Sequence, residues 1–139
     1  MSPAEDLLDW LRTGDVRALS IRQPWPHHIL HDGKDIENRS WRTRRRGWFL
    51  IHAGTCKIEA PEFITRLQLP LGGIVGAARI TGCADASSSR WWLGPVGFEL
   101  ADPIEIDLVP CLGRLGFFRL DEAALDEVRG QLERQVRKS

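Results

Sequence analysis

Lys34 and Glu37 lie three residues apart, between Gly33 and Arg39, at a spacing that could serve proton transfer. A partly desolvated lysine has a lowered pKa, which lets it act as a base or activate a nucleophile. The same spacing also suits a solvated ion pair on a strand edge, so the residues alone leave both interpretations open. Lys34 and Glu37 are the candidate catalytic residues of the chain.

Five arginines and no acidic residue lie between positions 39 and 46. A guanidinium group matches a phosphate with two parallel hydrogen bonds, and each phosphate neutralised adds salt-dependent affinity. A solubilising loop is the alternative, although five arginines without one acid are an uncommon way to build it. We predict a phosphate-binding segment, in which alternation along 42–46 places some side chains on opposite faces. Its basic members are Arg39, Arg42, Arg44, Arg45 and Arg46.

Tryptophans are numerous for a chain of this length. Trp48 begins an apolar run and is expected in the core. Trp41 lies within the basic segment and is expected at the rim of a cleft, where stacking of one base contributes about 1–3 kcal/mol. Trp91 and Trp92 are adjacent in a serine-rich loop and cannot both point inward along an extended chain, so one of them is a candidate lid or stacking platform.

Histidines and cysteines do not combine into a metal site. His27 and His31 are four residues apart on an expected helix, but only Asp32 and Asp35 lie near enough to complete a ligand set, so neither a metal nor another cofactor is predicted. His52 is expected to be a hydrogen-bonded core histidine. The cysteines are odd in number, far apart and without a CxxC motif, which predicts buried free thiols in a reducing cytoplasm. They are Cys56, Cys83 and Cys111.

The elements that must position these residues follow from apolar runs bounded by glycine and proline. Strands are expected at 18–21, 48–53, 74–83, 98–100, 104–109 and 114–120, and residues 34–40 fit either a strand or an extended loop. Helices are expected at 3–13, 24–31, 58–67 and 121–137. Ser2 and Glu5 form a capping box for the first helix, and Asp121 caps the last. Several strands with few, short helices predict an α+β fold, a small mixed β-barrel with peripheral helices.

Several ordered motifs resemble the ASCH (activating signal cointegrator homology) family. The resemblance covers about residues 18–120 and leaves the first and last helices outside. The residues that carry it are Leu19-Ser20-Ile21-Arg22-Gln23-Pro24-Trp25, Gly33-Lys34, Ile36-Glu37-Asn38-Arg39-Ser40-Trp41-Arg42-Thr43, Arg46-Gly47, Ile51-His52-Ala53, Gly73-Ile74-Val75-Gly76, Trp91, Gly94-Pro95, Phe98-Glu99-Leu100 and Gly113-Arg114-Leu115-Gly116-Phe117-Phe118.

The resemblance implies a PUA-like fold that binds RNA or DNA in a cleft lined by the basic motif. Ser20, Arg22 and Gln23 would line the entrance, where Arg22 and Gln23 could contact a base edge or a phosphate. The candidate nucleic-acid-binding residues are Ser20, Arg22, Gln23, Trp25, Lys34, Glu37, Arg39, Trp41, Arg42, Thr43, Arg44, Arg45, Arg46 and Trp91.

The resemblance also raises enzymatic alternatives. Some family members hydrolyse RNA, and others remove the acetyl group of N4-acetylcytidine through a Lys, a Thr and a Glu. This chain keeps Lys34 but has Glu37 where those deacetylases have Thr, and residues 74–80 contain no carboxylate. The deacetylase triad is therefore incomplete, and Lys34 is its only retained member.

Length and composition bound these alternatives. The 139 residues, of which 42% are hydrophobic and 27% charged, predict a single domain spanning 1–139. Because the formal net charge is zero, no overall electrostatic attraction to nucleic acid or membrane is expected. No apolar run approaches the roughly 20 residues of a membrane span, so a cytoplasmic protein is expected. We favour a module that binds single-stranded RNA, DNA or a modified nucleotide over a ribonuclease or amidohydrolase. A protein-interaction domain using the acidic 96–111 segment ranks third.

Overall fold

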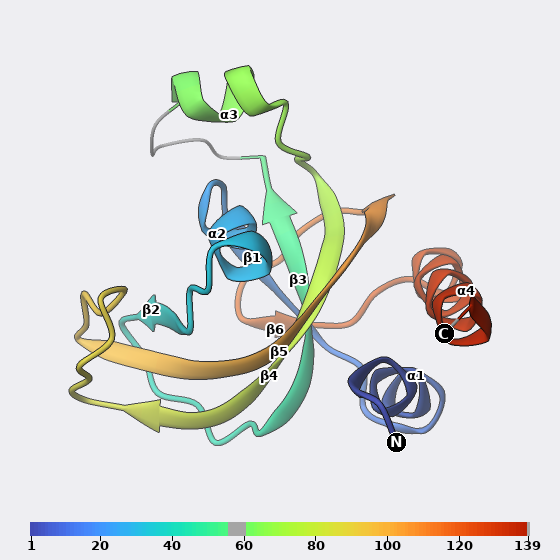
Figure 1. Cartoon of the computed structure of the whole chain (residues 1–139), viewed down its shortest axis with the longest axis horizontal. Coiled ribbons are helices and arrows are strands. Elements are labelled where there is room, and N and C mark those ends of the chain that lie inside the picture. Colours follow the sequence, from blue (N-terminus) through green and yellow to red (C-terminus); the bar gives the residue numbers. More distant parts are fainter. Residues whose placement is uncertain (56–60, 139) are drawn as a thin grey trace.

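The computed structural model describes residues 1–55 and 61–138, in which a six-stranded sheet curls into a partial barrel (Figure 1). The strands lie in the order β2-β5-β4-β3-β1-β6. They are β1 Ala18–Arg22, β2 Ile36–Arg39, β3 Gly47–Gly54, β4 Gly73–Ala84, β5 Val96–Pro110 and β6 Phe117–Phe118. The helices are α1 Pro3–Thr13, α2 Trp25–His31, α3 Pro61–Leu67 and α4 Glu122–Lys138. The predicted α+β class with a small barrel and peripheral helices is confirmed.

Strand pairing brings the ends of β1 and β3 together. These two strands are parallel, with Ser20 opposite His52 and Arg22 opposite Gly54, whereas all other neighbours in the sheet are antiparallel. Because parallel strands run in one direction, their carboxyl ends meet at the same edge of the sheet. Polar residues at the end of β1 and of β3 therefore share one edge of the partial barrel.

The sheet curls where β4 carries small residues. Its register with β5 shifts near Gly76, where an added Cβ would lie 2.5 Å from the carbonyl oxygen of Ile104. A residue with a side chain would collide with this neighbouring backbone, so glycine permits the close approach of β4 and β5. The irregular register bends the two long strands, which contributes to the curl of the sheet (Figure 1).

Two apolar cores hold the partial barrel. One lies between the outer sheet face and the paired helices α1 and α4, which run side by side (Figure 1), and contains Leu7, Leu11 and Leu132. The other fills the inside of the curl beneath α2 and contains Ile29 and Phe49. The predicted capping box is present at the start of α1, and the side chain of the residue before α4 accepts from Ala124, so both helix starts are confirmed.

Two strand predictions are wrong. Residues 98–100 and 104–109 form one continuous strand, β5, because Pro103 lies beside Asp102, whose φ of 52° marks a bulge between register pairs. A proline in a bulge removes no ladder hydrogen bond, so it does not end the strand. The expected strand 114–120 shrinks to Phe117–Phe118, and residues 111–116 form a loop in which Leu115 is fully exposed.

Some predicted features lie partly or wholly outside the described residues. Ile58, the expected start of the third helix, and Cys56 lie outside them, and the described helix α3 begins at Pro61. Cys83 and Cys111 are free thiols and are half-buried. Among the described helices, none combines the length and apolar character needed to cross a bilayer.

Candidate functional site

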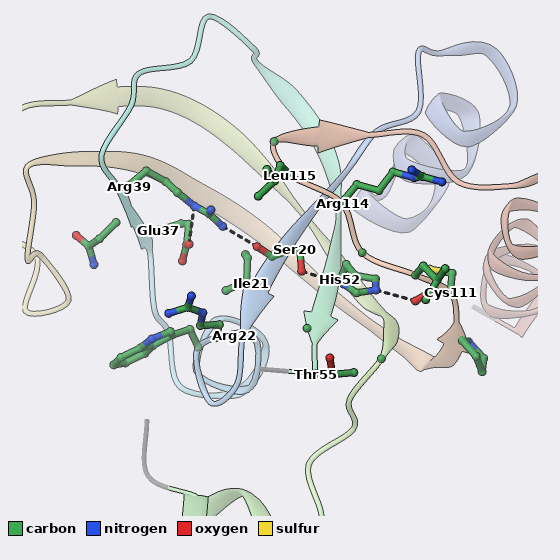
Figure 2. A pocket seen from close by; sticks show the side chains of 18 residues that line it. Ser20, Ile21, Arg22, Glu37, Arg39, His52, Thr55, Cys111, Arg114 and Leu115 are labelled. Atoms are coloured by element: carbon green, nitrogen blue, oxygen red, sulfur yellow. Dashed lines mark hydrogen bonds and ion pairs between the residues drawn. The ribbon is translucent and has the colours of Figure 1, made fainter. Parts of the chain in front are cut away.

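A cleft of about 1030 Å³ opens at the carboxyl ends of β1 and β3 (Figure 2). One wall is formed by Glu37 to Arg39 of β2, and the opposite wall by the loop 111–116, which follows β5. Trp25, the first residue of α2, also lines the cleft. Segments that are distant in the sequence therefore border one hollow at the edge where the parallel strands end.

Three arginines line the cleft, and we call them the cleft arginines. They are Arg22, Arg39 and Arg114, contributed by the end of β1, by β2 and by the loop 111–116. Arg22 and Arg114 are exposed and make no ion pair with the described residues, which leaves their guanidinium groups available to a ligand. Glu37 is the one acidic side chain among the described lining residues, so the cleft carries an excess of positive charge.

Arg39 is held in place by contacts on both sides. Its Nε atom donates to Oε2 of Glu37 over 3.0 Å, and its Nη2 atom donates to the main-chain oxygen of Ser20 over 2.8 Å (Figure 2). Glu37 has a side chain that is only 7% exposed, and Arg39 is 21% exposed. The guanidinium group thus ties β2 to β1 while it faces the cleft.

The candidate catalytic pair is buried and its pKa values are displaced. Nζ of Lys34 lies 3.6 Å from Oε1 of Glu37 and donates to the main-chain oxygen of Ile36. Burial lowers the pKa of Lys34, with the charge of Glu37 opposing that shift. Burial likewise raises the pKa of Glu37, against the opposing charges of Arg39 and Lys34. Desolvation thus favours the neutral form of each partner.

Lys34 and Glu37 face different spaces. Glu37 lines the cleft, whereas Lys34 lines a separate cavity of about 90 Å³ together with Gly33, Asp35 and Pro103. The Lys34 side chain is 3% exposed, and its Nζ atom lies 5.6 Å from the centroid of the Trp25 ring. Lys34 is therefore placed behind the cleft wall, where it supports Glu37 and Trp25 from the rear.

The arginines predicted to form a phosphate-binding segment lie mostly elsewhere. Apart from Arg39, none of them lines the cleft, and we call the remaining four the loop arginines: Arg42, Arg44, Arg45 and Arg46. Arg42 pairs with Asp85, and Arg45 donates to the main-chain oxygen of Asp15 over 2.6 Å. Arg46 donates to carbonyl oxygens of its own loop, and Arg44 is exposed.

Four more predicted binding residues have structural partners outside the cleft. Gln23 is buried, donates to the oxygen of Pro70 and accepts from the amide of His27. Trp41 contacts the rings of Phe98 and Phe117 edge-on. The Thr43 hydroxyl accepts from the amide of Arg45, and Trp91 lies 5.2 Å from His28, centroid to centroid. Of the fourteen candidates, the cleft is lined by Ser20, Arg22, Trp25, Glu37 and Arg39.

The structure adds cleft residues that the sequence analysis did not select. Arg114 lies between Gly113 and Gly116 in a segment that was expected to be a strand. The two nearby glycines were the sequence feature that could have indicated a loop. His52 was expected in the core, and it is 2% exposed with both ring nitrogens hydrogen-bonded. It also lines the cleft, where Ser20 and Gly113 lie directly against it.

The histidines of α2 have acidic partners. His28 lies 2.6 Å from Asp32 and His31 lies 2.6 Å from Glu105, measured between ring nitrogen and carboxylate oxygen. Within residues 1–55 and 61–138, no three His, Cys, Asp or Glu side chains are grouped so as to hold a metal ion. These hydrogen bonds fasten α2 locally and across to β5.

A comparison with protein-family models identifies a family for this chain. The family model described as ASCH domain matches residues 19–114, which is more than half of the chain. The cleft arginines and the pair Ser20 and His52 all lie inside the matched range, whereas α1 and α4 lie outside it. A search of the curated proteins found no match.

Proposed function

Because the chain belongs to the ASCH domain family, we propose that it binds RNA or DNA, as a single strand or a modified nucleotide, in the cleft at the ends of β1 and β3. The family supports a PUA-like RNA-binding or hydrolase-type domain in general. The observation that carries the proposal is that the cleft arginines come from three separate segments and line one hollow. The whole chain has a formal net charge of zero, but the fold gathers basic groups in the cleft. This local excess of positive charge favours an anionic ligand that binds there.

Each part of the cleft has a role in this proposal. Arg22 and Arg114 are exposed and without ion pairs among the described residues, so they hold phosphates. The Trp25 ring lines the cleft and supplies a face on which a base can stack, a contact that every base can make. The roughly 1030 Å³ of the cleft accommodates a ligand of nucleotide size.

The proposal is tested by reversing charge at two places. The double variant Arg22→Glu/Arg114→Glu should weaken binding of a fluorescein-labelled single-stranded RNA at least tenfold in an anisotropy titration, because about two phosphate contacts are lost. The dependence of log Kd on log salt should become shallower by about two in slope for the same reason.

The matched control is Arg42→Glu/Arg44→Glu, which changes the net charge by the same amount at loop arginines outside the cleft. Its affinity should stay within about threefold of the parent, because only long-range attraction to the RNA is weakened. If this control loses as much affinity as the cleft variant, the ligand binds at the loop arginines. Unchanged binding in Arg22→Glu/Arg114→Glu would end the proposal.

A hydrolase of the ASCH type is the second candidate, and Glu37 is the observation that favours it. Its carboxyl lines the cleft, and burial raises its pKa, which suits a group that donates a proton to a leaving atom. Binding is the first choice because Lys34 lies behind the wall and β4 carries no carboxylate. Scoring the same RNA, and N4-acetylcytidine, for product formation separates the two candidates.

A further inference from the structure

The hydroxyl group of Ser20, which lines the cleft, donates its proton in a hydrogen bond within the protein. Its Oγ atom lies 3.1 Å from Nδ1 of His52, and Nε2 of His52 lies 2.8 Å from the main-chain oxygen of Cys111 (Figure 2). A carbonyl oxygen can only accept, so Nε2 carries the proton of the neutral imidazole. Nδ1 then has only a lone pair, and Ser20 must donate its proton to it.

Three segments hold this arrangement. The parallel register places Ser20 beside His52, and the loop 111–116 supplies the carbonyl oxygen that selects the tautomer. Arg39 donates to the main-chain oxygen of Ser20 over 2.8 Å, which fixes that residue from the side of β2. The hydroxyl is therefore preorganised, and the oxygen keeps only its lone pairs for a ligand.

Two glycines leave the Ser20 oxygen open to the cleft. A Cβ atom added at Gly54 or at Gly113 would lie 3.1 Å from the Oγ atom, and at Gly113 it would also lie 2.7 Å from Cε1 of His52. Neither glycine has a φ in the left-handed region. The site therefore uses the missing side chains of these residues rather than their backbone freedom.

We propose that Ser20 and His52 form an acceptor-only subsite that takes the exocyclic amino group of a nucleobase and rejects a carbonyl oxygen in its place. The inference rests on the proposed function, that nucleotides bind in this cleft. A carbonyl oxygen facing Ser20 would place two acceptors against each other, and both would lose hydrogen bonds to water without replacement.

The same polarity orients the ligand. Phosphate oxygens only accept hydrogen bonds, so a phosphate gains nothing from the Ser20 oxygen and lies toward the exposed Arg22 and Arg114. The base then points toward the floor, between Trp25 and the loop 111–116, with its amino group on Ser20.

The test compares nucleotides in which a carbonyl group, with its neighbouring ring N–H, replaces an exocyclic amino group. AMP and IMP form one such pair, and CMP and UMP form the other. Isothermal titration of the full chain should show the amino member binding at least about tenfold more tightly in one or both pairs. In Ser20→Ala the ratio should fall to near one while both members of the pair still bind, and in the control Ser88→Ala, an exposed serine, it should keep the parent value.

His52→Phe provides a second readout. Without the Nδ1 acceptor, the Ser20 proton is free to donate, so the carbonyl member should bind more tightly than it does to the parent. Equal affinities within both pairs for the parent protein, or a ratio unchanged in Ser20→Ala, would overturn the subsite and leave nucleotide binding standing. Failure of all four nucleotides and of RNA to bind would overturn the proposed function, and the subsite with it.

Discussion

The cleft arginines and the loop arginines are chemically identical groups in contrasting surroundings. The loop arginines are close together in the sequence, but Arg42 and Arg45 contact Asp85 and Asp15, and the group lies outside the cleft. The cleft arginines are far apart in the sequence and are brought together by the end of β1, by β2 and by the loop 111–116. Density of charge along the chain therefore does not show which arginines the fold brings together around one cleft.

The largest contrast is expected in stability. Arg39→Met removes the closest charged partner of the buried Glu37 and should lower the free energy of unfolding by about 3 kcal/mol. Arg42→Met breaks a pair whose side chains are 55% and 78% exposed, and should cost less than about 0.5 kcal/mol. Urea unfolding of both variants beside the parent measures the difference. Equal losses would show that the two arginines are held alike.

A smaller contrast concerns the carboxyl groups beside the two sets of arginines. Burial raises the pKa of Glu37, whereas the pKa of Asp15 is lowered, first by the hydrogen bond from Arg17. A carboxyl with a raised pKa in the folded state binds its proton more tightly there than in the unfolded chain. The stability that it contributes is therefore present at low pH and declines as the pH rises through the raised folded-state value. A lowered pKa has the opposite sign.

The prediction is that Glu37→Gln removes a decline in stability that sets in as the pH rises above the ordinary range of glutamate. Asp15→Asn should instead remove a loss of stability that sets in as the pH falls below the ordinary range of aspartate. Urea midpoints measured from acidic to neutral pH check the direction of both changes in stability. The control is Glu127→Gln, because Glu127 is an exposed glutamate on α4. A parent protein whose stability relative to Glu37→Gln rises with pH would contradict the buried environment of Glu37.

The fold was largely predictable because its strands are apolar runs bounded by glycine and proline. The prediction failed at Pro103, since a local pattern cannot show that a proline falls in a bulge of a paired strand. It also failed at 114–120, where only Phe117 and Phe118 pair with β1. The fully exposed Leu115 belongs to the loop that replaces the rest of the expected strand.

The site was predictable in part. Ser20, Arg22, Trp25, Glu37 and Arg39 were selected as binding residues and do line the cleft. The loop arginines do not, because the acids that engage two of them come from the α1–β1 connection and from the turn after β4, which sequence spacing cannot place. Arg114 was missed because it enters the cleft on a loop that was expected to be a strand.

Binding of nucleic acid in the cleft is tested most directly by mapping where the nucleic acid contacts the protein. Backbone amide shifts of isotope-labelled protein should be followed by NMR during titration with a short single-stranded RNA. The largest changes are predicted at Ser20 to Arg22, at Asn38 and Arg39, and along the loop 111–116, with small changes over 41–46. Changes concentrated over 41–46, with the loop 111–116 unaffected, would contradict binding in the cleft and move the binding site to the loop arginines.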